Sequence, residues 1–299
     1  MPKSYNVVND YHNSRLDRWF KHNVINLPHS LIEKLIRQNK IKVNKKKTKS
    51  SYRVQSGDLI EIYDILKFKP IDIEKKIKYI PKKSEVGQYD DYVIEDNKNF
   101  IIINKPSGIA VQAGTKSFKN IIDAIKNTKY FENSKPYIVH RIDKETSGLL
   151  IIAKNRQYAQ LFTSLFRIRK IHKTYLALVY GKVNNSARTM RDELTYYENK
   201  KKITQKAISN LKVIKSNESY SFVELNPITG RKHQLRKQLL KIGNPIIGDN
   251  KYYLNSRKIV KVKNLLLHAY KIKFMINNVQ YNFKAKYNEL FENFLNNNF

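Results

Sequence analysis

The carboxylate of Asp143 stands in a short polar segment that could perform nucleophilic or base chemistry. The segment, His140 to Leu150, follows the apolar residues Tyr137-Ile138-Val139 and runs into an apolar stretch typical of a buried strand. Arg141 and Lys144 flank the carboxylate, and opposite charge within a few ångströms lowers the pKa of a carboxyl group. We therefore expect an ionised Asp143, able to act as a nucleophile or a base. Taken alone, the segment could equally be a structural ion-pair turn.

Other residue types narrow the chemistry further. The chain of 299 residues contains no Cys, which excludes disulfides and thiolate metal or redox sites. Its seven His residues show no ligand spacing such as H-E-x-x-H, so no metal site is expected.

The residues around Asp143 predict a sheet to hold it. A hairpin is expected at 92–95 and 100–104, an amphipathic helix at 158–166 and a short helix within 231–240. Further strands are expected at 174–180, 203–214, 220–225, 272–276 and 279–283. Because few long helices separate these strands, the pattern favours an α+β fold with a mixed, largely antiparallel sheet.

Residues 14–63 form a separate pattern of two helices and a hairpin. The second helix begins near Pro28 and has apolar residues at helical spacing. Its opposite face carries Lys34 and Arg37, followed by Lys40. This arrangement resembles the S4 RNA-binding domain, which implies that these three cations contact folded RNA. Residues 64–91, with no clear period, are interpreted as a linker, and 92–299 as the second domain.

The formal charge of +33 indicates a polyanionic partner, either nucleic acid or an acidic membrane surface. The cations cluster: eight lie between Lys34 and Lys49 without one acidic residue, and nine lie between Glu145 and Asp192. Such stripes favour an RNA-facing surface, although a lysine run can also be an ordinary solvated face. Residues 1–11 lack the apolar core of a signal peptide, and no apolar run approaches the roughly 18 residues of a membrane span. A soluble, cytoplasmic protein is expected.

Several motifs, in matching order, are similar to those of the RluA-type pseudouridine synthases. The segment around Asp143 resembles the catalytic signature of that family. The other matching blocks are Ile101 to Gly108, Lys173 to Leu178, Leu225 to Arg236, Gly243 to Asp249 and Leu265 to Ala269. The third of these motifs departs from the family pattern after Arg236, where Lys237-Gln238 replaces Val-His.

The resemblance implies the pseudouridine synthase fold behind an S4 domain, and a role for each matching residue. Asp143 would be the catalytic group, Tyr175 would stack on the target uracil, and Arg236 would pair with Asp143 through a forked contact. Arg141 would enter the space that the flipped uridine vacates, or else contact a phosphate.

The implied reaction breaks the N1–C1′ bond of uridine, turns the base and forms a C5–C1′ bond. It needs no cofactor, because nothing is oxidised and nothing leaves the site. Whether Asp143 attacks C1′, attacks the base or removes the C2′ proton is left open. The uracil must first leave its stack, which costs a few kcal/mol in paired RNA.

The resemblance extends to enzymes of the RluC type, which modify large-subunit (23S) ribosomal RNA, and less strongly to the RluD type. We expect a monomer that acts on ribosomal RNA or on an assembling large subunit, without a membrane or a small-molecule cofactor. One alternative is a non-catalytic RNA-binding or ribosome-assembly factor on the same fold. A ribose methyltransferase is disfavoured because the chain has no glycine-rich nucleotide loop.

Overall fold

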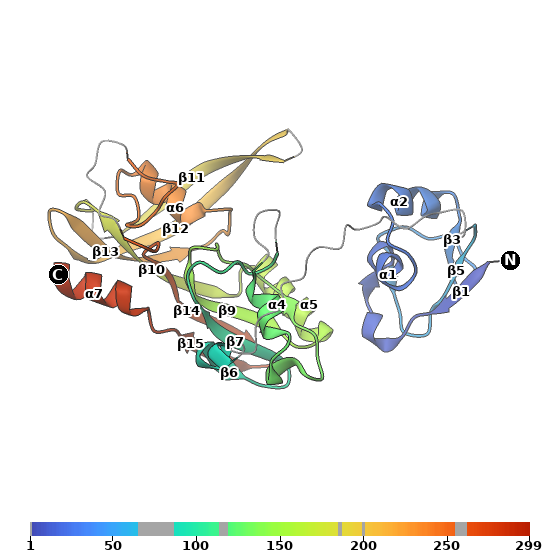
Figure 1. Ribbon diagram of the computed structural model, residues 1–299. Coiled ribbons are helices and arrows are strands. Elements are labelled where there is room, and N and C mark those ends of the chain that lie inside the picture. The colour runs from blue at the N-terminus through green and yellow to red at the C-terminus, as the bar shows by residue number, and fades with distance from the viewer. Residues whose placement is uncertain (1, 65–86, 114–118, 185–186, 199–200, 255–261) are drawn as a thin grey trace. The chain divides into compact units, whose positions relative to one another are not determined.

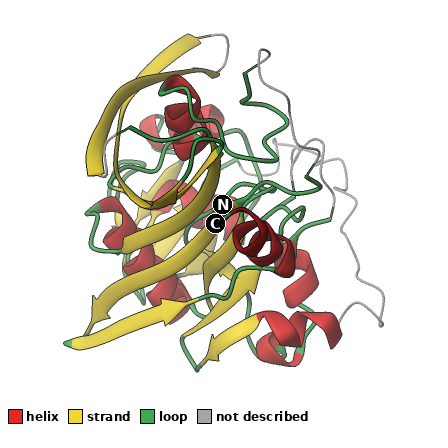
Figure 2. Ribbon diagram, turned by 90° about the vertical axis from the view of Figure 1, so that its left-hand side faces the viewer, coloured by secondary structure: helices red, strands yellow, loops and turns green. Residues whose placement is uncertain are grey.

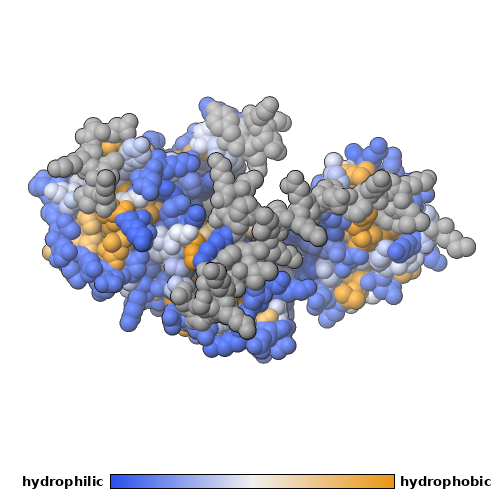
Figure 3. Space-filling view, in the orientation of Figure 1, coloured by the Kyte–Doolittle hydropathy of each residue, from blue (hydrophilic) through white to orange (hydrophobic). Residues whose placement is uncertain are grey.

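The chain divides into two compact units, Met1–Ile77 and Lys78–Phe299, which are described separately. The computed structural model describes residues 2–64, 87–113, 119–184, 187–198, 201–254 and 262–299 (Figure 1). Most of the predicted linker, residues 65–86, lies outside the described residues. On the face drawn in Figure 3, hydrophilic residues cover most of the described surface of each unit.

The first unit combines two helices with short strands. Its helices are α1 (Leu16–Asn23), α2 (His29–Arg37) and the 3-10 turn η1 (Asn9–Tyr11), and its strands are β1 (Lys3–Asn6), β2 (Ser14–Arg15), β3 (Ile41–Val43), β4 (Arg53–Val54) and β5 (Leu59–Ile62). The strands form a sheet of order β1-β5-β3 and the separate pair β2-β4. Because β1 pairs with β5, this unit begins before residue 14, where the sequence pattern starts.

The core of the first unit explains its two helices. In α1 the aromatic residues Trp19 and Phe20 are buried, and in α2 Ile32, Leu35 and Ile36 are buried at helical spacing. Both helices therefore place one apolar face against the sheet, and the polar face of α2 remains in solvent.

The second unit is built on one large sheet. Its strands are β6 (Val93–Asp96), β7 (Phe100–Lys105), β8 (Tyr137–Ile138), β9 (Ser147–Ala153), β10 (His172–Tyr180), β11 (Ala187–Glu198), β12 (Lys201–Ser216), β13 (Tyr220–Pro227), β14 (Leu267–Ile276) and β15 (Val279–Lys284). Its helices are α4 (Ile121–Ile125), α5 (Arg156–Arg167), α6 (Gln234–Lys241), α7 (Glu289–Asn298) and the 3-10 turns η3 (Gly87–Tyr92) and η4 (Lys129–Phe131). The strand order is β11-β12-β13-β10-β14-β9-β7-β6, with β15 beside β14 and β8 beside β9. Figure 2 shows these strands side by side, with helices on their flanks.

Strands β7 and β9 are buried on both faces, which explains their continuous apolar sequences. Phe100, Leu149 and Ile151 pack on one side with Phe162 of α5. Alternate residues of the two strands pack on the other side with Ile121 of α4. The segment that leads into β9 is thereby attached to the most buried part of the sheet.

All strand pairings of this sheet are antiparallel except that of β9 with β14, which is parallel over two residue pairs. Gly148 makes this close approach possible, because its φ is +109° and an added Cβ would lie 2.3 Å from the carbonyl oxygen of Ala269. Beside it, Nε2–H of His268 donates to the carbonyl of Ala285 (3.2 Å), so Nδ1 accepts from the hydroxyl of Ser147 (2.9 Å). The mixed, largely antiparallel sheet with flanking helices confirms the predicted α+β class. Within the described part of the chain, no helix is both long and apolar enough to cross a bilayer.

Candidate active site

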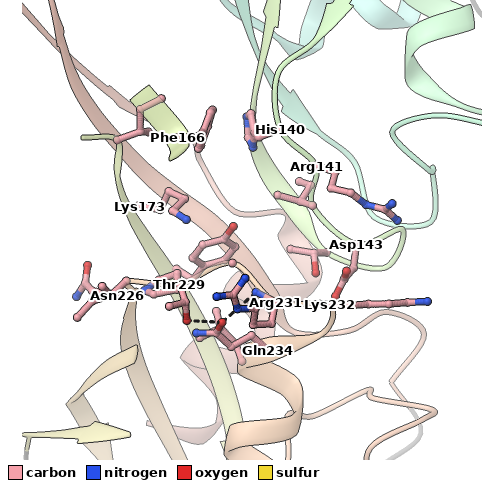
Figure 4. Close-up of a pocket in the computed structure, with 18 of the residues that line it drawn as sticks. His140, Arg141, Asp143, Phe166, Lys173, Asn226, Thr229, Arg231, Lys232 and Gln234 are labelled. Carbon is pink, nitrogen blue, oxygen red and sulfur yellow. Dashed lines mark hydrogen bonds between the residues drawn. The ribbon is translucent and has the colours of Figure 1, made fainter. Parts of the chain in front are cut away.

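A cavity of about 920 Å³ opens in the second unit beside β10 (Figure 4). Its walls come from three places: the segment before β9, the end of α5 with the start of β10, and the segment joining β13 to α6. The lining residues used below are His140, Arg141, Asp143, Phe166, Arg167, Arg169, Lys173, Tyr175, Asn226, His233 and Arg236. Residues from distant parts of the sequence thus meet at one cavity.

Asp143 lies at this cavity with its side chain 21 % exposed. Burial raises the pKa of its carboxyl group above the ordinary value, and Glu145 and Asp249 act in the same direction. Arg236 and Arg141 oppose the shift without reversing it. The expectation of a lowered pKa is therefore wrong, because the desolvation of Asp143 outweighs the nearby cations.

The backbone of the catalytic segment is fixed by a buried lysine. Lys105, at the end of β7, is fully buried, and its ammonium donates to the carbonyls of Pro106 (2.8 Å), Ile109 (2.9 Å) and Lys144 (3.2 Å). Burial lowers the pKa of Lys105 to about 7. The N–H of Gly108 also donates to the carbonyl of Lys144 at 2.9 Å. The strand-and-turn motif at 101–108 therefore holds the segment that carries Asp143.

Arg236 faces two carboxylates, and its forked contact goes to the unexpected one. Its Nε and Nη2 donate to the two oxygens of Asp249, each at 2.7 Å, whereas Nη1 lies 3.8 Å from Asp143. Nη1 is also 3.5 Å from Glu145. The fork was expected on Asp143 and is instead made with Asp249, whose side chain is fully buried and so depends on this charge for compensation.

Asp249 also organises the residues that follow it. Its Oδ1 accepts from the backbone N–H groups of Lys251 and Tyr252, both at 2.9 Å. The guanidinium of Arg236 lies 5.1 Å from the centre of the Tyr252 ring, and the Tyr252 hydroxyl is 2.9 Å from Nδ1 of His233. This cluster keeps Arg236 in place beside Asp143.

His233 lies 3.8 Å from the other oxygen of Asp143. Burial and the cation of Arg236 lower the pKa of this imidazole to about 4. The ring is therefore neutral near pH 7 and does not form an ion pair with Asp143. It acts as scaffold, held by Tyr252.

Tyr175 reaches the cavity from β10, where it pairs with Leu225 of β13 and Ala269 of β14. Burial and the neighbouring Asp143 raise the pKa of its phenol, which keeps the hydroxyl protonated. Arg141 lines the same cavity with an exposed side chain. The structure therefore brings together all four residues that the resemblance assigned to this unit.

His140 lines the cavity next to α5. Its Nε2 accepts from the backbone N–H of Ile151 at 2.9 Å, and its ring stacks on Phe166 with centroids 4.6 Å apart. Burial lowers the pKa of His140 to about 3. A neutral, bonded and stacked imidazole is a structural group.

The departure from the family pattern at Gln238 has a local explanation. This fully buried amide accepts from the Ser209 hydroxyl (2.8 Å) and donates to a carboxylate oxygen of Asp192 (2.9 Å). Gln238 thus joins α6 to β11 and β12, and the helix that carries Arg236 remains attached to the sheet.

The three cations predicted to bind RNA lie in the first unit. Lys34 and Arg37 are exposed on α2, and Lys40 follows that helix and pairs with Asp64. Sequence reasoning missed Glu145, Asp249 and Tyr252 as partners of the site. One indication of a role for Asp249 was available from the sequence, because this residue ends one of the blocks that resemble the family.

Comparison with known proteins identifies first the family profiles and the fold that the chain matches. The profile of the family described as RNA pseudouridylate synthase matches residues 99–241, and that of the S4 domain matches residues 24–60. The solved structure of Human RNA Pseudouridylate Synthase Domain Containing 4 superposes with a TM-score of 0.61 at 24 % identity. That superposition covers 71 % of this chain and 95 % of the human one.

Curated relatives narrow the class. The chain is 37 % identical over 276 residues to the Ribosomal large subunit pseudouridine synthase C of Rickettsia conorii, covering 88 % of this chain and 89 % of that protein. It is 33 % identical over 282 residues to the protein of the same name from Buchnera aphidicola subsp. Schizaphis graminum, covering 90 % and 88 %. The chain therefore belongs to the RNA pseudouridylate synthase family, with an S4 domain, and is an RNA pseudouridine synthase. This confirms the resemblance seen in the motifs.

Proposed function

We propose that this enzyme isomerises specific uridines of large-subunit ribosomal RNA, with Asp143 as the catalytic carboxylate. The observation that carries the assignment is the meeting of Asp143, Tyr175 and Arg236 at one cavity. The relatives from Rickettsia and Buchnera, whose names specify the large ribosomal subunit, support the choice of RNA. The same names favour the RluC type over the RluD type.

Each residue has a role that its surroundings support. Arg236, held by Asp249, lies beside Asp143 and opposes the rise in its pKa that burial causes. Tyr175 presents a flat, protonated ring for the flipped uracil. Arg141, exposed at the rim, would fill the vacated stack or contact a phosphate. The reaction needs no cofactor.

The first unit would contribute to the affinity for RNA and would take no part in the reaction. Lys34 and Arg37 project from α2, and Lys40 follows that helix, where a folded RNA could meet them. We propose residues 14–63 as the RNA-binding part of the first unit, 64–91 as the linker and 92–299 as the catalytic part, with β1 completing the sheet of the first unit and η3 packing on the second. With ribosomal RNA as substrate, the enzyme would act in the cytoplasm as a single chain.

The first test is a map of pseudouridines in total RNA from cells with and without this gene. Loss of one or more sites in the large-subunit RNA, and their return with the wild-type gene, is expected. An unchanged map of pseudouridines would contradict the proposal that large-subunit ribosomal RNA is the substrate. The positions that disappear would also separate RluC-type from RluD-type specificity.

The second test replaces the catalytic group. Asp143→Asn is nearly isosteric and removes only charge, so folding and RNA binding should persist while pseudouridine formation is abolished. Substantial turnover by the purified variant would contradict the role of Asp143. A non-catalytic assembly factor makes the opposite prediction for cells, because the Asp143→Asn gene would then rescue every defect of the deletion.

A further inference from the structure

Lys173 places an ammonium group at the catalytic cavity from the same strand as Tyr175. The two residues are two positions apart in β10, so both side chains project from the same face of the strand. In Figure 4 the Lys173 side chain points into the cavity, toward the side where Asp143 lies. Phe166 and His140 border it at one end of the cavity and Asn226 at the other.

The ammonium of Lys173 has no hydrogen-bond or ion-pair partner among the residues that the structure describes. The contrast with Lys105 is informative, because that lysine is also removed from water but donates to three backbone carbonyls. Lys105 has the surroundings of a structural lysine. Lys173 lacks them, although an unpaired cation removed from water is expensive to keep.

Among the described residues, no carboxylate pairs with the ammonium of Lys173 in the free protein. Burial is the only cause that lowers the pKa of Lys173. The carboxylates of Asp143, Glu145 and Asp249 cluster instead around Arg236. On the segment before β9, burial and then the charge of Lys173 lower the pKa of His140, so this imidazole stays neutral. An anionic atom of the substrate is the partner that this site can still accept.

We propose that Lys173 is a further catalytic residue, whose ammonium donates a hydrogen bond to a carbonyl oxygen of the detached uracil. This role rests on the proposed function. When the C1′–N1 bond breaks, its electron pair stays on the base, and the negative charge spreads from N1 to the O2 and O4 oxygens. C1′ is then electron-deficient, and the attack of C5 on it turns the same pair into the C5–C1′ bond, breaking any bond that C1′ has made to Asp143. The C5 proton passes to the Asp143 carboxylate or to water and N1 takes up one proton in return, so the product has the atoms of the substrate. Lys173 keeps its own proton throughout and stabilises the anion between the two steps.

A phosphate oxygen is the other anionic atom that RNA offers. The location of Lys173 disfavours a contact with phosphate. Arg167 and Arg169 line the same cavity with exposed side chains, where a backbone phosphate would arrive from solvent. Lys173 is partly buried and lines the cavity two positions before Tyr175, on whose ring the base would lie. Charge that develops only during the reaction gains most from a donor in a site that excludes water.

The test is Lys173→Met, which keeps an unbranched side chain only one atom shorter and removes its charge. With in-vitro-transcribed large-subunit ribosomal RNA and excess enzyme, the single-turnover rate should fall by about 10²- to 10³-fold, as for the loss of one donor to a developing anion. The Kd for the same RNA should change by less than about twofold, because most RNA affinity comes from phosphate contacts. The thermal midpoint should equal or exceed that of wild type, because an unpaired buried charge is removed.

The matched control is Lys182→Met, an exposed lysine just beyond the other end of β10 whose surface ion pair with Glu218 contributes little. It should leave the rate unchanged. A Lys173→Met rate within about threefold of wild type would overturn the proposal. So would a weaker Kd whose effect disappears at saturating enzyme, since that identifies a phosphate contact, or a fall in thermal midpoint that accompanies the reduced rate. A wild-type enzyme that forms no pseudouridine in this RNA would instead refute the proposed function.

Discussion

At the scale of single residues, Arg236 binds one carboxylate tightly and only approaches the catalytic one. Its two short contacts go to Asp249, and only a 3.8 Å contact reaches Asp143. Burial raises the pKa of Asp143 in the free protein, and the cation beside it opposes this shift without reversing it. Asp249 fixes the position of the Arg236 guanidinium. The positive charge of Arg236 is thereby held near the catalytic carboxylate of Asp143.

Replacing Arg236 with Lys should damage both stability and activity. The ammonium keeps the charge but cannot make two parallel contacts to Asp249, so a buried acceptor is left unsatisfied. We expect the free energy of unfolding to fall by about 1–3 kcal/mol and the single-turnover rate to fall strongly. Denaturant unfolding and rate measurements test this, with the exposed Arg191→Lys as control. Wild-type rates in Arg236→Lys would show that the fork does not matter.

The acid limb of the rate profile should report the pKa of Asp143. A carboxylate with a raised pKa is present above that pKa and disappears as the pH falls through it, so activity should decline on acidification. Glu145→Gln removes an anion that raises the pKa of Asp143 and frees Nη1 of Arg236. Both effects lower that pKa, so the acid limb should move to lower pH.

The control for this shift is Glu218→Gln, a highly exposed glutamate paired with Lys182. It removes the same charge elsewhere and should leave the profile in place. Superimposable profiles for wild type and Glu145→Gln would mean that the acid limb belongs to another group.

At the scale of elements, the apolar pattern predicted most of the second unit. The strands at 100–104, 174–180 and 220–225 and the helix at 158–166 are confirmed, because their apolar residues follow strand or helix periods. Strand β11 was missed. Its buried residues Met190 and Leu194 are four positions apart and are separated by charged side chains, which hides the period of two.

The site was harder to predict than the fold. Asp143, Tyr175 and Arg236 could be named from motifs, and they meet. The forked contact between Arg236 and Asp249 could not be predicted. The two residues are 13 positions apart, and only the tertiary fold, with its turn at Gly248, brings the carboxylate next to the guanidinium. The pKa of Asp143 was misjudged because adjacency in sequence was treated as proximity, while desolvation follows from tertiary packing.

The contact between β9 and β14 gives a prediction at this scale. In Gly148→Ala the new Cβ would meet the Ala269 carbonyl at 2.3 Å, on backbone that cannot move without separating the strands. We expect a large fall in thermal midpoint, with a loss of about 4 kcal/mol or more in unfolding free energy. Gly108→Ala is the matched control, because Gly108 also has positive φ but open space around it. Its loss should be about 1–2 kcal/mol. Equal losses in the two variants would mean that strain, and not collision, dominates.

At the scale of the whole molecule, the charge of +33 should appear in the salt dependence of RNA binding. Removing one cation that touches a phosphate lowers the slope of log K against log salt by about one. Lys34→Gln with Arg37→Gln in the full chain should therefore reduce the slope by up to about two and weaken binding. The rate at saturating RNA should not change.

The control for α2 is Lys3→Gln with Lys21→Gln, which removes two exposed charges from the same unit but from other elements. A salt titration of all three proteins separates local contacts from net charge. Identical slopes for the two double variants would show that α2 has no privileged role in binding RNA.

The short parallel contact between β9 and β14 also joins parts of the chain that are synthesised at different times. Ser147 contacts His268 across 121 positions of sequence, so β9, which already pairs with β7 and β8, gains this third neighbour only after β14 has been synthesised. Folding during synthesis proceeds from the N-terminus, and contacts this distant form late. A nascent chain that stops before β14 would carry the signature around Asp143 without the strand that packs against its far end. If the substrate is ribosomal RNA, we expect such a chain to be unable to act on the ribosome that is making it.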